Sequence, residues 1–140
     1  MRWRKPKNEE LMREQPLNRI CYVEDDEDIQ RVVRMSLERV GKMTVEVVGD
    51  STRAIEAIIA FKPDLVMLDW MMPVMDGPAV FRKMREHAET MHLPVVFITA
   101  KASQRELDEL RTMGAAGVIS KPFSPKNLPD QLRGIWHSLP

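Results

Sequence analysis

The chain has 140 residues, with very little cysteine and no excess of charge of either sign. Cys21 is its only cysteine, so no disulfide can form within the chain, and its place in an apolar run predicts a small buried side chain. Its 21 Lys and Arg residues balance its 21 Asp and Glu residues. This balance gives no global argument for binding to nucleic acid or to a membrane.

Long hydrophobic runs are also missing. No stretch approaches the roughly 20 apolar residues that span a bilayer, and no apolar region follows the basic amino terminus, as a secretory signal requires. We therefore expect a globular protein of the cytoplasm that neither inserts into a membrane nor binds DNA directly. The length fits one domain with a core of its own.

The chain divides into a polar start and an alternating remainder. Residues 1–18 are charged and contain prolines, which favours a flexible extension over a dedicated docking segment. From residue 19 onward apolar runs alternate with amphipathic segments, and we expect one domain over residues 19–140. The predicted strands are 19–24, 43–48, 64–69, 93–98 and 116–120, and the predicted helices are 27–40, 52–61, 78–88, 102–113 and about 125–138.

The pattern of the predicted strands indicates the fold class. The runs 65–68 and 95–98 are apolar throughout, as in strands that are covered on both faces in parallel sheets. Five strand–helix units predict an α/β fold with a doubly wound, five-stranded parallel sheet. The ligand site of such a sheet lies beyond the carboxyl ends of the strands, where the strand order reverses.

Polar groups follow four of the apolar runs. Glu24 and Asp25 follow the first run and Asp69 follows a later one, while Thr99 and Lys121 follow the last two. Taken singly, each has a simpler role, such as a helix start, a turn residue, a cap or a solvated charge. Taken together at one sheet edge, they favour a Mg²⁺ site beside a carboxylate, Asp69, that can accept a phosphoryl group.

Four motifs in this order resemble those of response-regulator receiver domains, the phosphoacceptor modules of two-component signalling. The resemblance covers about residues 19–138 and implies a flavodoxin-like sheet with strand order 2-1-3-4-5. The motifs are Val23-Glu24-Asp25-Asp26, Leu68-Asp69-Trp70-Met71-Met72-Pro73-Val74-Met75-Asp76-Gly77, Ile98-Thr99-Ala100 and Ser120-Lys121-Pro122-Phe123.

The resemblance also implies the roles of the site residues. Asp69 would be phosphorylated, and Thr99 and Lys121 would contact the phosphoryl oxygens. The donor would be the phosphohistidine of a sensor histidine kinase or of a histidine phosphotransfer protein. The chain would be a signalling domain that assists its own phosphorylation and dephosphorylation, not an enzyme. The implied Mg²⁺ ligands are the side chains of Glu24, Asp25 and Asp69 and the backbone carbonyl of Met71.

The sequence departs from the family's usual pattern at the fifth strand. In family members, the residue that corresponds to Thr99 is usually coupled to an aromatic residue on the fifth strand. This chain has Val118 at the matching position. We therefore predict that phosphorylation acts on the face formed by the last two helices and the last strand through Thr99 and the following loop, over a smaller rearrangement. Met71 cannot orient water by a hydrogen bond and Lys101 can shield the phosphoryl oxygens, which leads to a hypothesis of slow dephosphorylation. Alternatively, Lys101 points to solvent.

We expect a stand-alone receiver, because no output domain fits after the last helix. Output would be protein–protein contact with a downstream partner or onward phosphotransfer to another histidine. An aspartyl-phosphate phosphatase of the haloacid-dehalogenase type is less favoured, since it needs a second Asp where Met71 stands. A nucleotide- or flavin-binding domain is also less favoured, because the six glycines form no cluster that could hold phosphate.

Overall fold

The structure is a computed structural model that describes residues 15–100 and 103–140. Within these residues, five parallel strands form one sheet in the order β2-β1-β3-β4-β5, which confirms the predicted fold. The strands are β1 (Arg19–Val23), β2 (Thr44–Val48), β3 (Leu65–Asp69), β4 (Val95–Thr99) and β5 (Gly117–Ser120). The helices are α2 (Glu27–Met35), α3 (Ala54–Phe61), α4 (Gly77–Glu86), α5 (Gln104–Thr112) and α6 (Leu128–Ser138), with a π-helical turn η1 (Ser36–Val40) and a 3-10 turn η2 (Ser51–Arg53).

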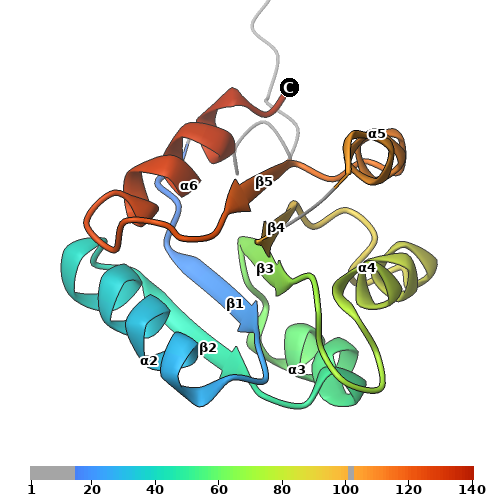
Figure 1. Ribbon diagram of the computed structural model, residues 1–140, viewed down its shortest axis with the longest axis horizontal. Coiled ribbons are helices and arrows are strands. Elements are labelled where there is room, and N and C mark those ends of the chain that lie inside the picture. The colour runs from blue at the N-terminus through green and yellow to red at the C-terminus, as the bar shows by residue number, and fades with distance from the viewer. Residues whose placement is uncertain (1–14, 101–102) are drawn as a thin grey trace, which may run out of the picture.

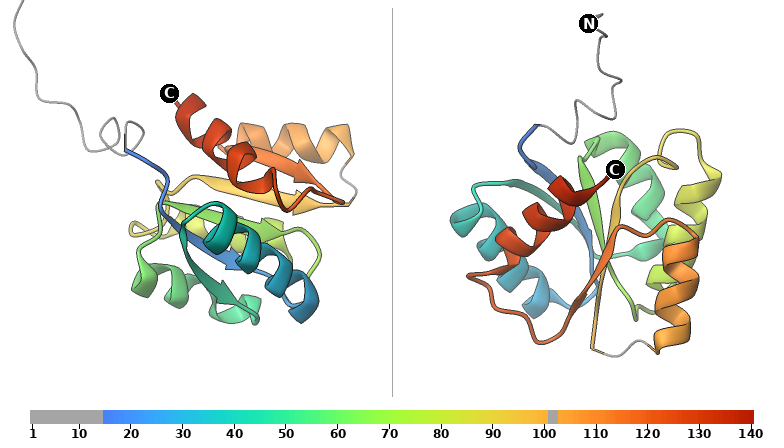
Figure 2. Two further views of the ribbon diagram at one scale, coloured as in Figure 1. Left: turned by 90° about the vertical axis from the view of Figure 1, so that its left-hand side faces the viewer. Right: turned by 90° about the horizontal axis from the view of Figure 1, so that it is seen from above.

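Helices cover both faces of the sheet (Figure 1). Helices α2 and α6 lie on one face, and α3, α4 and α5 lie on the other, as the further views in Figure 2 also show. Because successive residues of a strand point to opposite faces, each inner strand supplies both cores. On β1, Ile20 and Tyr22 join the core under α2 and α6, whereas Cys21 and Val23 join the core under α3 and α4.

The predicted boundaries agree closely with the structure except at the first and last helices. Helix α6 begins at Leu128 and not near residue 125. Pro129 lies in its first turn, where the backbone N–H that proline lacks would have no acceptor within the helix. The predicted helix 27–40 is α-helical only as far as Met35 and continues as the π-helical turn η1. Neither difference moves the edge of the sheet at which the predicted site lies.

The acidic run after β1 has two roles. The Asp26 carboxylate caps α2 by accepting hydrogen bonds from the backbone N–H groups of Asp28 and Ile29, at 2.9 and 3.1 Å. A helix start is thus the right interpretation for this part of the run. Glu24 and Asp25 precede the cap, which leaves their carboxylates available for the site.

The chain before β1 is described from Gln15. Leu17 is buried in the same core as Trp136, and the indole N–H of Trp136 donates to the carbonyl oxygen of Gln15 at 2.8 Å. Part of the predicted extension 1–18 therefore packs against α6. The division of the chain at residue 19 stays a prediction.

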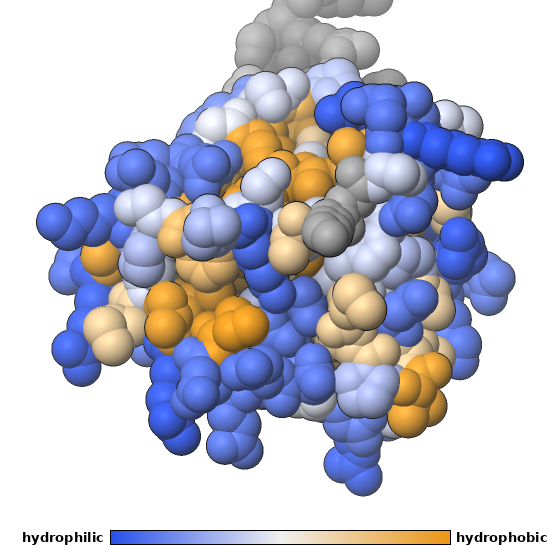
Figure 3. All heavy atoms as spheres, in the orientation of Figure 1, coloured by the Kyte–Doolittle hydropathy of each residue, from blue (hydrophilic) through white to orange (hydrophobic). Residues whose placement is uncertain are grey.

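The surface is mostly polar on the face shown in Figure 3, where hydrophobic residues form small separate groups. None of the helices that the structure describes is long and apolar enough to cross a bilayer. Met71 and Val74, in the loop after β3, are among the exposed large hydrophobic residues, which are Val32, Met35, Val40, Met71, Val74 and Met91.

Candidate functional site

The carboxyl ends of the strands bring the predicted site residues to one edge. Asp69 is the last residue of β3 and Thr99 is the last residue of the neighbouring β4. Glu24 follows β1, and its backbone N–H donates to the carbonyl of Val48 at the end of β2, at 3.0 Å. Lys121 follows β5, and its backbone N–H donates to the carbonyl of Thr99 at 2.8 Å. The parallel ladder therefore places four residues that are distant in sequence along one edge.

Three carboxylates meet at this edge. Single carboxylate oxygens of Glu24, Asp25 and Asp69 all lie within 4.8 Å of one another. Glu24 and Asp69 are only 1% and 5% exposed, whereas Asp25 is exposed. The Lys121 ammonium donates to Asp69 Oδ1 at 2.9 Å and lies 3.6 Å from Glu24 Oε1.

The donor chemistry of this cluster fits a magnesium ion. By formal charge, three carboxylates and one ammonium leave two negative charges uncompensated, which matches a divalent cation. The ligand atoms are oxygens, the atoms that Mg²⁺ prefers. The residues present therefore fit the ion that the sequence predicted, and Mg²⁺ itself stays part of a proposal.

The pKa values of the cluster reflect its crowding. Burial, and then the hydrogen bond and charge of Asp69, raise the pKa of Glu24 to about 7, against the smaller lowering effects of Tyr22 and Lys121. Burial lowers the pKa of Lys121, but the hydrogen bond and charge of Asp69, followed by those of Glu24, outweigh it and raise that pKa overall. Lys121 thus stays charged, and the pKa of Glu24 lies near neutral pH when no cation is present.

The site contains one contact that the sequence analysis missed. The hydroxyl of Tyr22 donates to Glu24 Oε1 at 2.9 Å. Burial, and then the charge of Glu24, raise the pKa of Tyr22 well above its usual range, so the hydroxyl keeps its proton. The spacing of two residues along a strand, which puts both side chains on one face, could have indicated this pair.

A tight return of the chain follows Asp69. The backbone N–H of Gly77 donates to the carbonyl of Trp70 at 2.9 Å, which closes the loop between β3 and α4. A Cβ atom at residue 77 would stand 2.3 Å from the carbonyl oxygen of Asp69, so this close approach requires glycine. The side chain of Met71, within the loop, is 80% exposed. The role predicted for the backbone carbonyl of Met71 stays a prediction.

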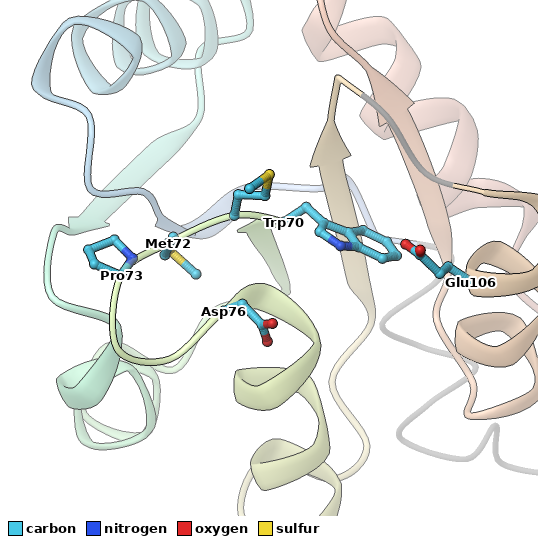
Figure 4. A pocket seen from close by; sticks show the side chains of 6 residues that line it. Trp70, Met72, Pro73, Asp76 and Glu106 are labelled. Carbon is cyan, nitrogen blue, oxygen red and sulfur yellow. The ribbon is translucent and has the colours of Figure 1, made fainter.

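An open groove of about 670 Å³ lies along the loop that follows β3. Figure 4 shows the indole of Trp70 extending from the end of β3 toward Glu106 on α5. The ring centroids of Trp70 and Phe97 lie 5.3 Å apart, so the indole also packs on β4. This places a fluorescent side chain next to Asp69. The residues lining the groove are Trp70, Met71, Met72, Pro73, Asp76 and Glu106.

The structure describes Thr99 and Val118, which concern the predicted path of the signal, but not Lys101. Thr99 is buried at the site edge, and Val118 is partly buried against the core under α3, α4 and α5. The predicted role of Thr99 in signal transmission stays a prediction. Lys101 lies outside the described residues, so the hypothesis of slow dephosphorylation also stays a prediction.

The comparisons with known proteins agree with this geometry. A sequence model described as the response regulator receiver domain matches residues 20–133. The chain belongs to this family. Receiver domains are signalling modules of two-component systems, as the sequence motifs predicted.

Several proteins are similar to this receiver domain. The phosphate regulon transcriptional regulatory protein PhoB of Pseudomonas aeruginosa is 32% identical over 117 residues, which are 83% of this chain and 50% of that protein. The chemotaxis protein CheY-3 of Vibrio cholerae is 31% identical over 121 residues, which are 86% of this chain and 93% of that protein. The structure of the chemotaxis protein CheY4 of Vibrio cholerae superimposes with a TM-score of 0.78 at 26% identity, and the match covers 85% of this chain and 98% of that one.

These relatives differ in length. The chain spans about half the length of the PhoB proteins that it matches and nearly the whole of CheY-3. The receiver domain is the part common to all of them.

Proposed function

We propose that this receiver domain is a single-domain response regulator that accepts a phosphoryl group on Asp69 in a Mg²⁺-dependent reaction. The position of Asp69 carries the proposal, because its carboxylate lies within 4.8 Å of two others and accepts a hydrogen bond from Lys121 at 2.9 Å. A carboxylate beside a cationic side chain can act as a nucleophile toward a phosphoryl group.

The reaction transfers a phosphoryl group from the phosphohistidine of a donor protein. A carboxylate oxygen of Asp69 forms the new P–O bond as the P–N bond breaks, and the electron pair of that bond returns to the imidazole of the donor. Thr99 and Lys121 contact the phosphoryl oxygens in this proposal. A bound Mg²⁺ ion would neutralise charge on those oxygens. It would be held by the side chains of Glu24, Asp25 and Asp69 and by the backbone carbonyl of Met71.

The donor in this proposal is a sensor histidine kinase or a histidine phosphotransfer protein. The match over 93% of CheY-3 supports the single-domain form, in which residues 19–140 are the receiver and residues 1–18 an extension. Output is then protein–protein contact with a downstream partner or onward phosphotransfer to another histidine, without direct binding to DNA or insertion into a membrane. The protein would act in the cytoplasm.

The proposal includes the fate of the phosphoryl group. The domain assists its own phosphorylation and dephosphorylation and acts as a switch, not as an enzyme. The exposed Met71 side chain offers no hydrogen bond to orient water, so we expect slow dephosphorylation. A phosphoryl lifetime of only seconds with Mg²⁺ present would contradict this part.

The path of the signal is part of the same proposal. Phosphorylation acts through Thr99 on the face formed by α5, β5 and α6, with Val118 in place of an aromatic residue. NMR spectra of the protein with and without the phosphoryl group test this path. Amide shifts on that face that stay unchanged would contradict it.

The chemistry is tested by incubating the protein with acetyl phosphate and MgCl₂ and measuring its intact mass. We expect the mass to increase by one phosphoryl group, and the increase to be absent with EDTA or in Asp69→Asn. Asp108→Asn, which removes an exposed carboxylate on α5, is the matched control and should still be phosphorylated. Equal phosphorylation of Asp69→Asn, or none in the unsubstituted protein, would refute the proposal.

A further inference from the structure

The hydroxyl of Tyr22, a residue of the core under α2 and α6, lies next to the carboxylates of the site. Tyr22 is fully buried, and its ring packs in the core under α2 and α6. Because alternate residues of a strand point to the same face, the side chains of Tyr22 and Glu24 leave β1 in the same direction. The hydroxyl of Tyr22 donates to Oε1 of Glu24 at 2.9 Å in a buried hydrogen bond.

Both oxygens of the Glu24 carboxylate have donors around them. Oε1 is approached by the Tyr22 hydroxyl and, at 3.6 Å, by the ammonium of Lys121. Oε2 accepts a weaker hydrogen bond from the backbone N–H of Asp26, at 3.4 Å. The hydroxyl of Tyr22 makes the shortest of these contacts, and it limits the rotation of a side chain that has one more rotatable bond than an aspartate.

This hydrogen bond has a simpler explanation, which depends on burial alone. A buried tyrosine hydroxyl needs an acceptor, and the Glu24 carboxylate provides one. That explanation predicts a change in stability when the hydroxyl is removed, and nothing more. The acceptor, however, is one of three carboxylates whose oxygens lie within 4.8 Å of one another. Outer hydrogen bonds commonly orient the groups that bind a metal.

We propose that Tyr22 is a positioning residue for the metal site, and that its hydroxyl holds the Glu24 carboxylate in the orientation that binds Mg²⁺. The inference rests on the proposed function and adds to it a residue outside the ligand set. Tyr22 orients the Glu24 carboxylate in the metal-free protein, before the ion binds. Its hydroxyl therefore affects the affinity for Mg²⁺ and leaves the chemistry at Asp69 unchanged once the site is filled.

The test compares the full chain with its Tyr22→Phe variant, which loses one oxygen atom and keeps the ring that fills the core. Titration with MgCl₂, followed by tryptophan fluorescence, should show a dissociation constant about tenfold higher in the variant. Phosphorylation by acetyl phosphate should be slower at low MgCl₂ and return to within about twofold of the parent rate at saturating MgCl₂. A hydroxyl that only stabilised the fold would not produce this difference between low and saturating MgCl₂.

Thr90→Val is the matched control, because Thr90 is also fully buried and its hydroxyl donates to the carbonyl of Met84, at 2.7 Å. Thr90 precedes β4 and so lies at the opposite edge of the sheet. Its substitution should leave the Mg²⁺ dissociation constant unchanged. In a Glu24→Ala background, Tyr22→Phe should have no further effect on that constant, since no carboxylate remains to be held. Urea unfolding shows that each variant is folded under the assay conditions.

The possible outcomes separate this inference from the proposed function. A dissociation constant for Tyr22→Phe within about twofold of the parent value would overturn the inference, as would an equal rise in Thr90→Val. Failure of the proposed function would appear in the unsubstituted protein, which would then bind no Mg²⁺ and gain no phosphoryl mass. That outcome would overturn both.

Discussion

Replacing Glu24 by glutamine should stabilise the metal-free protein, although Glu24 is a proposed metal ligand. The side chain is buried beside Asp69, and its pKa is raised to about 7 from an ordinary value of 4.5, first by burial and then by Asp69. Above pH 7 the folded protein therefore holds a carboxylate whose ionisation is unfavourable there. Glutamine has the same shape, carries no charge and can still accept the hydrogen bond from Tyr22.

The size of the effect follows from the two pKa values. Between pH 4.5 and about pH 7 the unfolded chain has released the Glu24 proton and the folded protein has kept it, so stability falls as the pH rises. The two pKa values differ by about 2.5, and a difference of one corresponds to about 1.4 kcal/mol. Ionisation of Glu24 therefore lowers the stability of the folded protein by about 3 kcal/mol at pH 8. At pH 5 the folded protein keeps the proton and the unfolded chain has only partly lost it. The same calculation then gives a loss of stability of about 1 kcal/mol.

The assay is urea unfolding in EDTA, at pH 8 and at pH 5, of the parent protein and Glu24→Gln. We expect the variant to be more stable by about 3 kcal/mol at pH 8 and by about 1 kcal/mol at pH 5. Glu89→Gln, at an exposed position, should change stability by less than about 0.5 kcal/mol at both pH values. A destabilised Glu24→Gln at pH 8, or a gain that does not depend on pH, would refute the reasoning.

Three further predictions concern the site and the scaffold that supports it. The affinity for Mg²⁺ should be about tenfold lower at pH 6 than at pH 8, because a proton on Glu24 competes with the ion; an affinity that does not change in a fluorescence titration contradicts this. Gly77→Ala should cost about 2–3 kcal/mol and slow phosphorylation, since its Cβ would meet the backbone of Asp69. Gly134→Ala on α6, where nothing lies within 4 Å, should instead add about 0.5–1 kcal/mol in the same urea assay. Arg85→Ala should cost about 2 kcal/mol, because its guanidinium donates to backbone carbonyls that precede β4 and β5; Arg85→Lys lacks the planar fork and should not restore this stability.

The strands and the acid cluster were predictable for one shared reason. Runs that are apolar throughout indicate strands covered on both faces, and parallel strands end at the same edge of their sheet. The sequence order of Glu24, Asp69 and Lys121 therefore carried most of the information about where they meet, and the structure confirms that their charged groups lie together. The last helix was harder to delimit, because Pro129 is compatible with a start before or after it.

Other features of the site depend on contacts between segments that a single sequence does not relate. The identity of Gly77 indicates a turn, but only the folded loop shows that its Cα faces the carbonyl of Asp69. Leu17 has no neighbours in sequence that mark it as part of the core. It is buried because the chain before β1 passes over the core under α6, and Trp136 donates to Gln15 there.

The sequence by itself determined the fold class, the edge of the sheet that holds the site and the carboxylates that meet there. All three follow from local patterns repeated along the chain. Only the tertiary structure decided that the Tyr22 hydroxyl comes within 2.9 Å of Glu24 Oε1, and that the pKa of Glu24 rises to about 7. The reason is that hydrogen bonds and desolvation depend on separations of a few ångströms between side chains, and packing sets those separations.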